Sequence, residues 1–497
     1  MAAYESWFKG KPELDILRLM GLFDRPAEGG ALDALRKEPA IPSLTTNLQS
    51  LSHADWQYAV ESLRTARLVA APDPHDPEGL DCHPLLREHL ADQLRAEDPA
   101  EWREAHSRLY EYYKSRAKER PDTLEEMTPL YAAVAHGCQA GRPQEALTEV
   151  YWQRITRGNK FFSTKKLGAF GADLAALSGF FDLPWRKVAD GLTEDAKAFV
   201  LGQAGFRLRA LGRLAESAQP MQAALEVRSA QKNWSEAARN ASNLSGLYLT
   251  LGDVNQALAY ARQSVELADR GGDAFLRMVN RTTLADALHQ AGQLAEAEAA
   301  FREAEEMQKA SQKEYPLLYA LQGFRYCDLL LSQGKVAEVQ RRVGQTLEWA
   351  TTQNLLLDIA LDHLSLGRAH LLQAQIGAHR DAPLRDAATY LDHAVDGLRQ
   401  AGQQDELPRG LLARAELRRA MGVLDKARDD LHEAFSIASR GGMRLHEADC
   451  HLAYARLYLA RGEKDKARES LAKAKQTIEQ TGYHRRDKEV AELEGQL

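Results

Sequence analysis

Apolar residues recur every three or four positions through residues 235–269, with a break at Gly252. A stripe with this spacing covers one face of an α-helix. Before the glycine it consists of Ala237, Ala241, Leu244, Tyr248 and Leu251, and after it of Ala257, Ala261, Val265 and Ala268. The pattern predicts two antiparallel helices, because glycine adopts the left-handed conformation that ends a helix without steric penalty.

The same motif, a glycine followed by four variable residues and then a small residue, recurs along the chain. It starts at Gly141, Gly212, Gly252, Gly292, Gly334, Gly422 and Gly462, with a degenerate copy near Gly377. From Gly212 onward, successive glycines are 40, 40, 42, 43, 45 and 40 residues apart. One hairpin cannot bury its apolar stripe alone, so neighbours stack. We therefore expect an all-α superhelix of seven or eight helical hairpins over residues 196–480, followed by a C-terminal tail at 481–497.

Residues 1–97 have a different pattern. Apolar helices are predicted at 12–23, at 31–37 and around Trp56. A stretch rich in proline, 71–81, separates two short apolar runs, 67–70 and 80–82, which we expect to pair as strands. Helices followed by a β-hairpin predict a winged-helix module.

Residues 98–195 form a predicted helical connector that contains one repeat-like hairpin at 130–151. Its stretch 151–170 mixes basic residues with aromatic ones, including Arg154, Arg157 and Trp152. Such a mixture can bind single-stranded nucleic acid. The alternative is a buried aromatic seam with a solvated basic face, and we favour it.

Composition and charge narrow the classes of protein. With 44% hydrophobic and 27% charged residues the chain has the composition of a folded, water-soluble protein. The net charge is 64 − 71 = −7, and residues 1–100, with 10 basic and 17 acidic residues, account for all of it. This acidic excess argues against DNA binding by the predicted winged helix. No signal peptide or membrane span is expected, and four widely spaced cysteines favour the reducing cytoplasm.

Catalytic and metal-binding signatures are absent from the sequence. It contains no GxSxG, HExxH or protein-kinase motif. The histidine pairs His446/His451 and His363/His370 lack further residues that would complete a metal site. We therefore expect neither enzymatic activity nor a metal or other cofactor.

The repeat motifs resemble those of the tetratricopeptide repeat family. The segments 251–268 (LGDVNQALAYARQSVELA) and 291–307 (AGQLAEAEAAFREAEEM) carry the resemblance. The period of about 40 residues is longer than the usual 34. The resemblance implies that the first helix of each hairpin lines a concave groove, where peptides or protein segments bind.

The N-terminal region resembles the winged helix of bacterial signal-transduction ATPases of the STAND class (NB-ARC and NACHT type). The segments 17–27, 39–51 and 80–90 (LDCHPLLREHL) carry this resemblance. In that family a histidine at the position of His83 contacts bound ADP. The sequence has no GxxxxGK[ST] phosphate-binding motif. The resemblance therefore implies a separate ATPase subunit or a larger ancestral protein.

Polar residues on the predicted first helices are the candidate ligand-binding residues. Asparagine can bond to a peptide backbone, and arginine can hold a carboxylate with two hydrogen bonds. The candidates are Arg239, Asn240, Asn243, Arg277, Asn280, Arg281, Arg325 and Tyr326, followed by Asp362, His363, Arg414 and Arg418.

The leading hypothesis is a non-enzymatic sensor module of a STAND-type signalling or defence system that binds a protein or peptide in the concave groove. The alternatives are a winged-helix transcription regulator on DNA, a passive scaffold for a multiprotein complex, and a fragment of a degraded gene. A sensor predicts a conditional partner, whereas a scaffold predicts a constant one.

Overall fold

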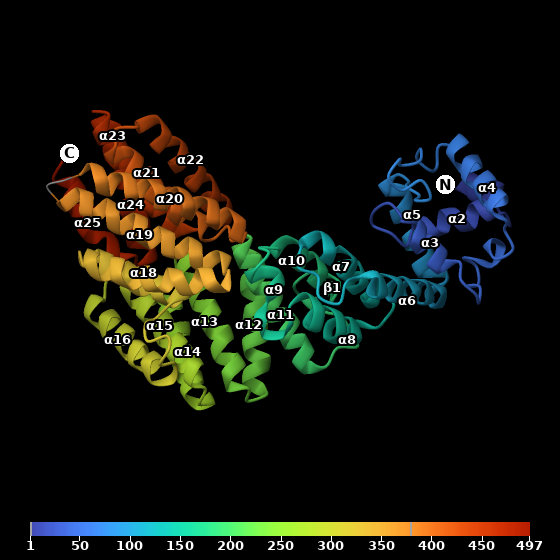
Figure 1. The fold of residues 1–497 in the computed structure, drawn as a ribbon, viewed down its shortest axis with the longest axis horizontal. Helices are drawn as coiled ribbons and strands as arrows, with labels where there is room; N and C mark the ends of the chain where they lie inside the picture. The colour runs from blue at the N-terminus through green and yellow to red at the C-terminus, as the bar shows by residue number, and fades with distance from the viewer. Residues whose placement is uncertain (1, 378–379) are drawn as a thin grey trace. The chain divides into compact units, whose positions relative to one another are not determined.

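The computed structural model of the chain describes residues 2–377 and 380–497. The chain forms two compact units, Met1–Asn159 with Ala189–Thr193, and Lys160–Val188 with Glu194–Leu497. These units do not divide the chain at residues 97 and 195, the boundaries predicted from the sequence. Figure 1 shows the helices of both units.

The first unit is built from helices and one short π-helical segment. Arg108 on α6 donates hydrogen bonds to the carbonyl oxygens of Leu35, Lys37 and Pro39, so this helix packs onto the N-terminal residues. The elements are α1 (Ala2–Trp7), α2 (Pro12–Met20), α3 (Gly29–Leu35), η1 (Thr46–Leu48), α4 (His53–Thr65), α5 (Pro84–Glu97), α6 (Pro99–Arg116), α7 (Leu124–Gln139), α8 (Pro143–Glu145) and the π-helix η2 (Ala146–Ile155), with η3 (Gly158–Lys160) following at its end.

The predicted hairpin of residues 67–70 and 80–82 does not form two regular strands. One backbone hydrogen bond joins the segments, from the Ala70 N–H to the Asp81 oxygen at 2.8 Å. Leu80 pairs instead with Ala27 in an isolated bridge. The expectation of two regular strands was wrong, because this single bond is too little for a ladder and the backbone groups of Leu80 bond to Ala27 on the opposite edge of the segment. The winged-helix interpretation stays a prediction.

The second unit starts with α9 (Phe162–Lys165), α10 (Phe170–Ser178) and an antiparallel pair of short strands, β1 (Phe181–Leu183) and β2 (Lys187–Val188). Seven antiparallel helical pairs follow within the described residues. They are α11 (Glu194–Ala210) and α12 (Leu214–Ala230), α13 (Trp234–Leu251) and α14 (Val254–Gly271), α15 (Ala274–Gln290) and α16 (Leu294–Ser311), α17 (Ala320–Ser332) and α18 (Val336–Gln353), α19 (Leu356–Ile376) and α20 (Asp381–Ala401), α21 (Leu407–Ala420) and α22 (Leu424–Gly441), and α23 (Arg444–Ala460) and α24 (Lys464–Thr481). The prediction of an all-α superhelix is confirmed.

The turn glycines behave as the pattern predicts, with one exception. Gly252 ends α13 at a φ of +85°, and Gly292 follows α15 at +79°. Gly377, in the degenerate copy, has a φ of −91° instead, and the extra residues 378–379 of that copy lie outside the described residues.

The repeat array closes on itself, so that early and late repeats touch. The Gln404 N–H, just before α21, donates to the Ala210 oxygen at the end of α11 at 2.6 Å. A Cβ atom added to Gly252 would lie 2.4 Å from the Cβ of Arg444. In Figure 1 helices α19 to α24 form one layer and α12 to α16 another, with α18 between them. The closure brings together first helices that lie nearly 200 residues apart in the sequence.

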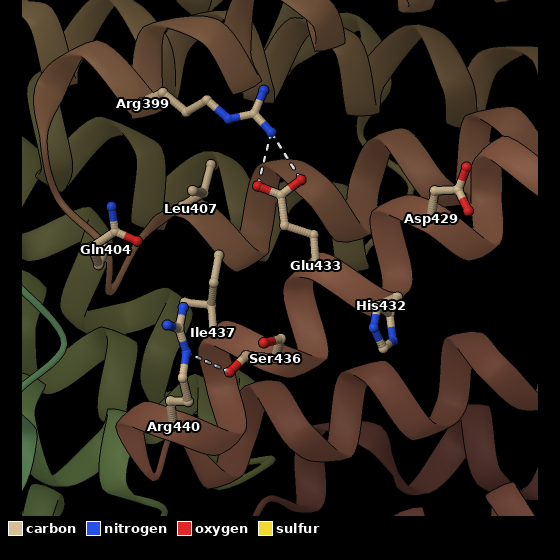
Figure 2. Close-up of a pocket in the computed structure, with 9 residues that line it drawn as sticks. All are labelled: Arg399, Gln404, Leu407, Asp429, His432, Glu433, Ser436, Ile437 and Arg440. Atoms are coloured by element: carbon tan, nitrogen blue, oxygen red, sulfur yellow. Dashed lines mark hydrogen bonds and ion pairs between the residues drawn. The ribbon is translucent and has the colours of Figure 1, made fainter.

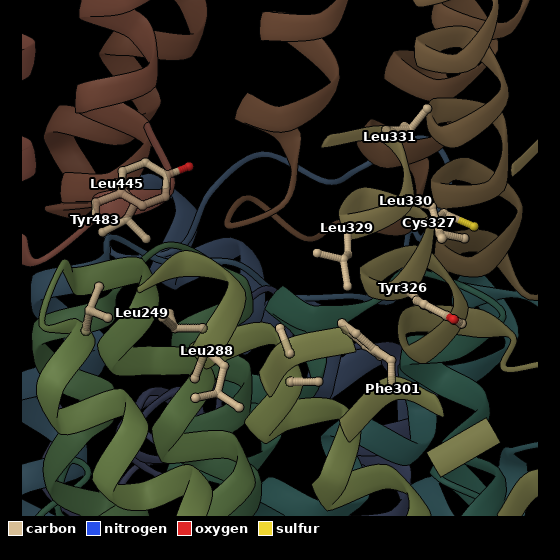
Figure 3. Close-up of a cluster of buried hydrophobic side chains, with 14 of the residues drawn as sticks. Leu249, Leu288, Phe301, Tyr326, Cys327, Leu329, Leu330, Leu331, Leu445 and Tyr483 are labelled. Atoms are coloured by element: carbon tan, nitrogen blue, oxygen red, sulfur yellow. The ribbon is translucent and has the colours of Figure 1, made fainter. Parts of the chain in front are cut away.

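Residues 481–497 are a folded part of this unit rather than the predicted tail. They form η4 (His484–Arg486) and α25 (Asp487–Glu494), and Tyr483, Val490 and Leu493 are buried. Figure 3 shows Tyr483 and Leu445 facing Leu249 and Leu288 in one apolar cluster. The C-terminal residues therefore share a core with the second and third repeats.

Candidate functional site

The first helix α13 contacts the first helix α23 across the closed array, and we call the surface that the first helices form on this side the inner face. Charged side chains meet on it. Arg209 on α11 pairs with Asp405 at 3.1 Å, and Arg325 on α17 pairs with Asp286 on α15 at 3.1 Å. Arg409 on α21 pairs with Glu406 at 2.8 Å. We call this set, together with Asp328, Arg368, His289, His446 and Arg485, the inner network.

The pKa values of two carboxyl groups of the inner network, Asp405 and Glu406, are shifted in opposite directions. Burial raises the pKa of Asp405 to about 6, although the Arg209 guanidinium opposes this. Burial acts in the same sense on Glu406, but there Arg409 and Arg209 outweigh it and lower the pKa. Burial also lowers the pKa of His446 to about 4. At neutral pH the carboxylates and arginines of the inner network form paired charges, whereas His446 is neutral.

Asp328 is the most strongly held acid of the inner network. It is 4% exposed and accepts from two guanidinium groups, that of Arg485 at 2.5 and 2.9 Å and that of Arg368 at 2.7 Å. Burial opposes its ionisation, but Arg485 and Arg368 outweigh burial and lower the pKa of Asp328 well below its usual value. The neighbouring His289 has a pKa lowered to about 2, first by burial and then by Arg485, and is neutral.

The candidate ligand-binding residues lie in three kinds of environment in the structure. Asn240 and Asn280 are buried, and each donates its side-chain amide to a carbonyl of its own helix, of Glu236 and Leu276 respectively. Tyr326 is buried as well and stacks on Phe301 at 5.0 Å. These three residues cannot contact a ligand in this structure, because they are buried between packed helices. The spacing of residues in the sequence alone had placed them in the groove.

Several other predicted residues are engaged in ion pairs within the unit. Arg281 contacts Asp269 and Glu303 at 3.0 and 2.6 Å, and Arg277 contacts Asp269 at 2.9 Å. Arg414 and Arg418 both pair with the buried Asp430. Asp362 is buried, and His363 packs against the rings of Tyr390 and His393.

Arg239 and Asn243 are the predicted residues that remain accessible on α13. The Arg239 side chain is 47% exposed, and its pair with Glu236 is long, at 3.4 Å. Asn243 is half-buried. The site assignment as a whole stays a prediction, with its best support at these two positions.

The sequence reasoning missed Arg209, Asp405, Arg409 and Arg485. Each lies near one end of a first helix or outside the paired helices, where charged residues follow no regular spacing in the sequence. The only signal is a charged residue, such as Arg209 in LRALG, next to an apolar stripe. Their pairing depends on the closure of the array and is invisible to a local pattern.

His83 and the basic stretch of the connector have local structural roles. The exposed His83 ends the loop before α5, and its Nδ1 atom accepts from the Leu85 N–H at 3.3 Å. Arg154 donates to the carbonyl oxygens of Lys114, Ala117 and Lys118 at the end of α6. Neither contact provides a phosphate site.

A pair of imidazoles joins α6 to α7 in the first unit, with His106 buried and His136 half-buried. The Nδ1 atoms of His106 and His136 lie 2.8 Å apart, so that one donates to the other. Burial lowers the pKa of His136 to about 4 and that of His106 as well. Both rings are therefore neutral at pH 7.

Acidification is expected to lower the folding stability that depends on the His106–His136 pair. The His136 pKa falls from 6.5 to about 4 on folding, so the unfolded state takes up a proton first as the pH drops below 6.5. Stability is complete above pH 6.5, and about 3 kcal/mol is lost by pH 4, at about 1.4 kcal/mol per pKa unit. Hydrogen exchange of α6 and α7 at pH 7 and near pH 4 would measure it, and His136→Asn should lack this part of the pH dependence. An equal dependence in both proteins would contradict the assignment.

Two of the surface depressions among the described residues lie in the second unit. One, of about 620 Å³, lies over α20 to α22 and contains the Arg399–Glu433 pair at 2.8 Å, shown in Figure 2. The other, of about 500 Å³, lies beside the strand pair and is lined by Trp185 and Arg213. Among the described residues no group of three potential metal ligands occurs, and no helix is long and apolar enough to cross a membrane.

Comparison with known proteins identifies the repeats. Residues 238–270 and 281–311 match the model of the tetratricopeptide repeat. The chain is thus a helical repeat protein that contains tetratricopeptide repeats. A search of the curated proteins finds no match.

Three solved structures are similar at low identity. A STAND protein with a tetratricopeptide repeat sensor from Pyrococcus horikoshii has a TM-score of 0.41 and 14% identity. The match covers 95% of this chain and 64% of the Pyrococcus protein, so this chain spans less than two thirds of that protein's length. The Rap conjugation gene regulator of the plasmid pLS20, in complex with the Phr* peptide, has a TM-score of 0.44 and 11% identity, covering 71% and 94%. The human IFIT1 dimer with PPP-AAAA has a TM-score of 0.43 and 19% identity, covering 82% and 80%. Likeness at these levels says nothing about function.

Proposed function

We propose that the protein is a non-enzymatic recognition module that binds a protein or peptide segment on the inner face of its superhelix. The observation that carries this proposal is the polarity of that face. The surfaces between neighbouring helices are apolar, whereas arginines and carboxylates from α11, α15, α17, α19 and α21 gather on the inner face. Most of these side chains are buried, and Arg409 and Arg368 are the more accessible ones, at 33% and 27% exposure. Charged groups in such numbers stabilise a fold little by themselves, which favours a role in recognition.

A second group of charges extends this face. The positive charges of Lys165, the last residue of α9, and of Lys166 act to lower the pKa of Asp358 on α19. The pKa of Lys165 is itself lowered, mainly by burial and also by the charge of Arg239 on α13. Burial nevertheless raises the pKa of Asp358 to about 6. Arg239, whose side chain is 47% exposed beside Glu236, is the group in this part of the inner face that suits a carboxylate of the ligand segment.

We place this module in a STAND-type signalling system of the cytoplasm. The support is the sequence resemblance of 80–90 (LDCHPLLREHL) and the position of His83 directly before α5. Nucleotide hydrolysis would come from an ATPase partner, because this sequence lacks the phosphate-binding motif. Ligand binding by the repeats would then release that partner to act.

Site-specific crosslinking tests the inner face. A photoreactive residue at position 243 is expected to capture the partner in native cells, and one at position 302 is not. Arg302 is the matched control because it lies on the second helix of its pair, α16, and its side chain is 69% exposed. The captured protein is then identified by mass spectrometry.

The crosslinking outcomes separate the hypotheses. A partner captured from position 243 only under stress supports a sensor, and one captured there under all conditions supports a scaffold. Equal capture from positions 243 and 302 would mean that the ligand binds elsewhere, and the inner-face proposal would be wrong.

A further inference from the structure

The C-terminal residues 483–497 contact the last helical pair as a cap would. The Tyr483 hydroxyl donates to Asp449 on α23 at 3.2 Å, and Arg486 donates to the same carboxylate at 2.7 Å. Glu489 on α25 pairs with Arg456. These contacts cover the exposed end of the array, which every solenoid requires.

The same segment also reaches the third and fourth repeats, which a cap does not need to do. Arg485 donates to Asp328 on α17 and, at 3.2 Å, to Gln290 on α15. Next to it, a Cβ atom added to Gly292 would lie 3.2 Å from the Cβ of His484. The chain end therefore lies against the inner face of helices that precede it by 157 and 195 residues.

The contact has the geometry of a guanidinium site. Both oxygens of Asp328 accept from two different nitrogens of Arg485, and the Gln290 Oε1 atom accepts from one of them. Two parallel bonds to a carboxylate match the planar fork of arginine, whereas the single ammonium of lysine cannot make both. Arg368 fixes the Asp328 carboxylate by a separate contact at 2.7 Å. The acceptors are therefore held in place by residues other than Arg485.

We propose that Asp328 and Gln290 form a subsite for an arginine of a protein or peptide ligand, and that Arg485 occupies this subsite in the unliganded chain. The proposal rests on the proposed function and adds its ligand chemistry and its regulation. The C-terminal segment is an internal competitor, because ligand and segment cannot both bind Asp328. The apparent affinity for the ligand is then reduced by the fraction of molecules in which Arg485 occupies the site.

A labelled peptide with the sequence of residues 481–497 (TGYHRRDKEVAELEGQL) is the probe, and fluorescence anisotropy with the full-length chain is the measurement. Arg485→Ala empties the subsite and is expected to bind the probe at least tenfold more tightly than the unmodified chain. The matched control is Arg428→Ala on α22, which removes a 53% exposed arginine and should bind the probe as the unmodified chain does.

Two further changes test the chemistry of the subsite. A probe with citrulline at the position of Arg485 keeps the shape but loses the charge, and its affinity for Arg485→Ala should fall at least tenfold. Adding Asp328→Asn to Arg485→Ala should have the same effect on the unmodified probe. Equal binding by the unmodified chain and Arg485→Ala, or no loss with citrulline, would overturn the proposal.

Two controls keep the result interpretable. If Arg485→Ala does not fold, judged by circular dichroism, Arg485→Lys replaces it, because lysine keeps the charge but not the fork. It should still bind the probe more tightly than the unmodified chain, and an unchanged affinity would overturn the proposal. Crosslinking from position 243 needs no probe peptide, so a captured partner together with a negative probe experiment rejects the subsite and retains the proposed function.

Discussion

Replacing Asp173 by alanine is expected to lower the free energy of unfolding of the second unit by about 3–5 kcal/mol, the usual cost of removing one partner of a buried ion pair. Asp173 on α10 accepts from the Arg207 Nε atom on α11 at 2.9 Å and from Ser163 at 2.9 Å. The Arg207 and Asp173 side chains are 2% and 0% exposed. Without Asp173, the Arg207 guanidinium stays buried and lacks its carboxylate.

Native-state hydrogen exchange of the α10 and α11 amides measures this loss, because it reports on this unit separately. The control is Asp465→Ala on α24, whose side chain is 99% exposed and pairs with Arg468 at 3.0 Å. An exposed pair of this kind contributes about 1 kcal/mol or less. Losses of similar size in the two variants would show that burial does not govern the effect.

The double change Asp173→Leu with Arg207→Met tests whether the loss in Asp173→Ala comes from the missing ion pair or from the buried Arg207 charge that remains. Apolar residues of similar volume often replace a buried ion pair without loss of stability. We expect the double variant to be more stable than Asp173→Ala. A double variant that is less stable would indicate that the loss of the ion pair, and not the buried guanidinium that remains in Asp173→Ala, determines the outcome.

Replacing Asp362 by asparagine is expected to stabilise the second unit increasingly as the pH rises. Asp362 on α19 is 3% exposed, and burial raises its pKa from 3.8 to about 8, with Asp358 adding to the rise. Because the folded-state pKa lies above the unfolded one, the wild-type chain loses stability as the pH rises from 3.8 to about 8. Asparagine does not titrate and escapes this loss.

The expected size of this effect follows from the two pKa values. Between pH 5 and pH 9 the stability of Asp362→Asn relative to wild type should increase by about 4 kcal/mol, at about 1.4 kcal/mol per pKa unit. Thermal unfolding, together with hydrogen exchange of the α19 amides, measures this increase in stability at both pH values. Asp465→Asn, at an exposed position, should show no such trend. A constant difference between Asp362→Asn and wild type would mean that Asp362 is ionised in the folded chain.

The repeat architecture could be predicted because its determinants are local. Gly252, with its φ of +85°, ends α13 where the pattern places the turn, and the stripes of Ala237, Ala241 and Leu244 are buried as expected. The same reasoning was wrong about the strands at 67–70 and 80–82, since Leu80 pairs with Ala27 from another part of the chain. It also placed Asn280 and Tyr326 in the groove, although packing buries both.

The amino-acid sequence alone determined the class of fold, the helical pairs and their turns, because periodicity and glycine act over a few residues. Only the tertiary structure decided which polar groups meet. The closure of the array brings Arg209 to Asp405 and Arg485 to Asp328, across 196 and 157 residues. No periodic signal encodes such a pairing, because it depends on the summed rotation of all the repeats between the partners.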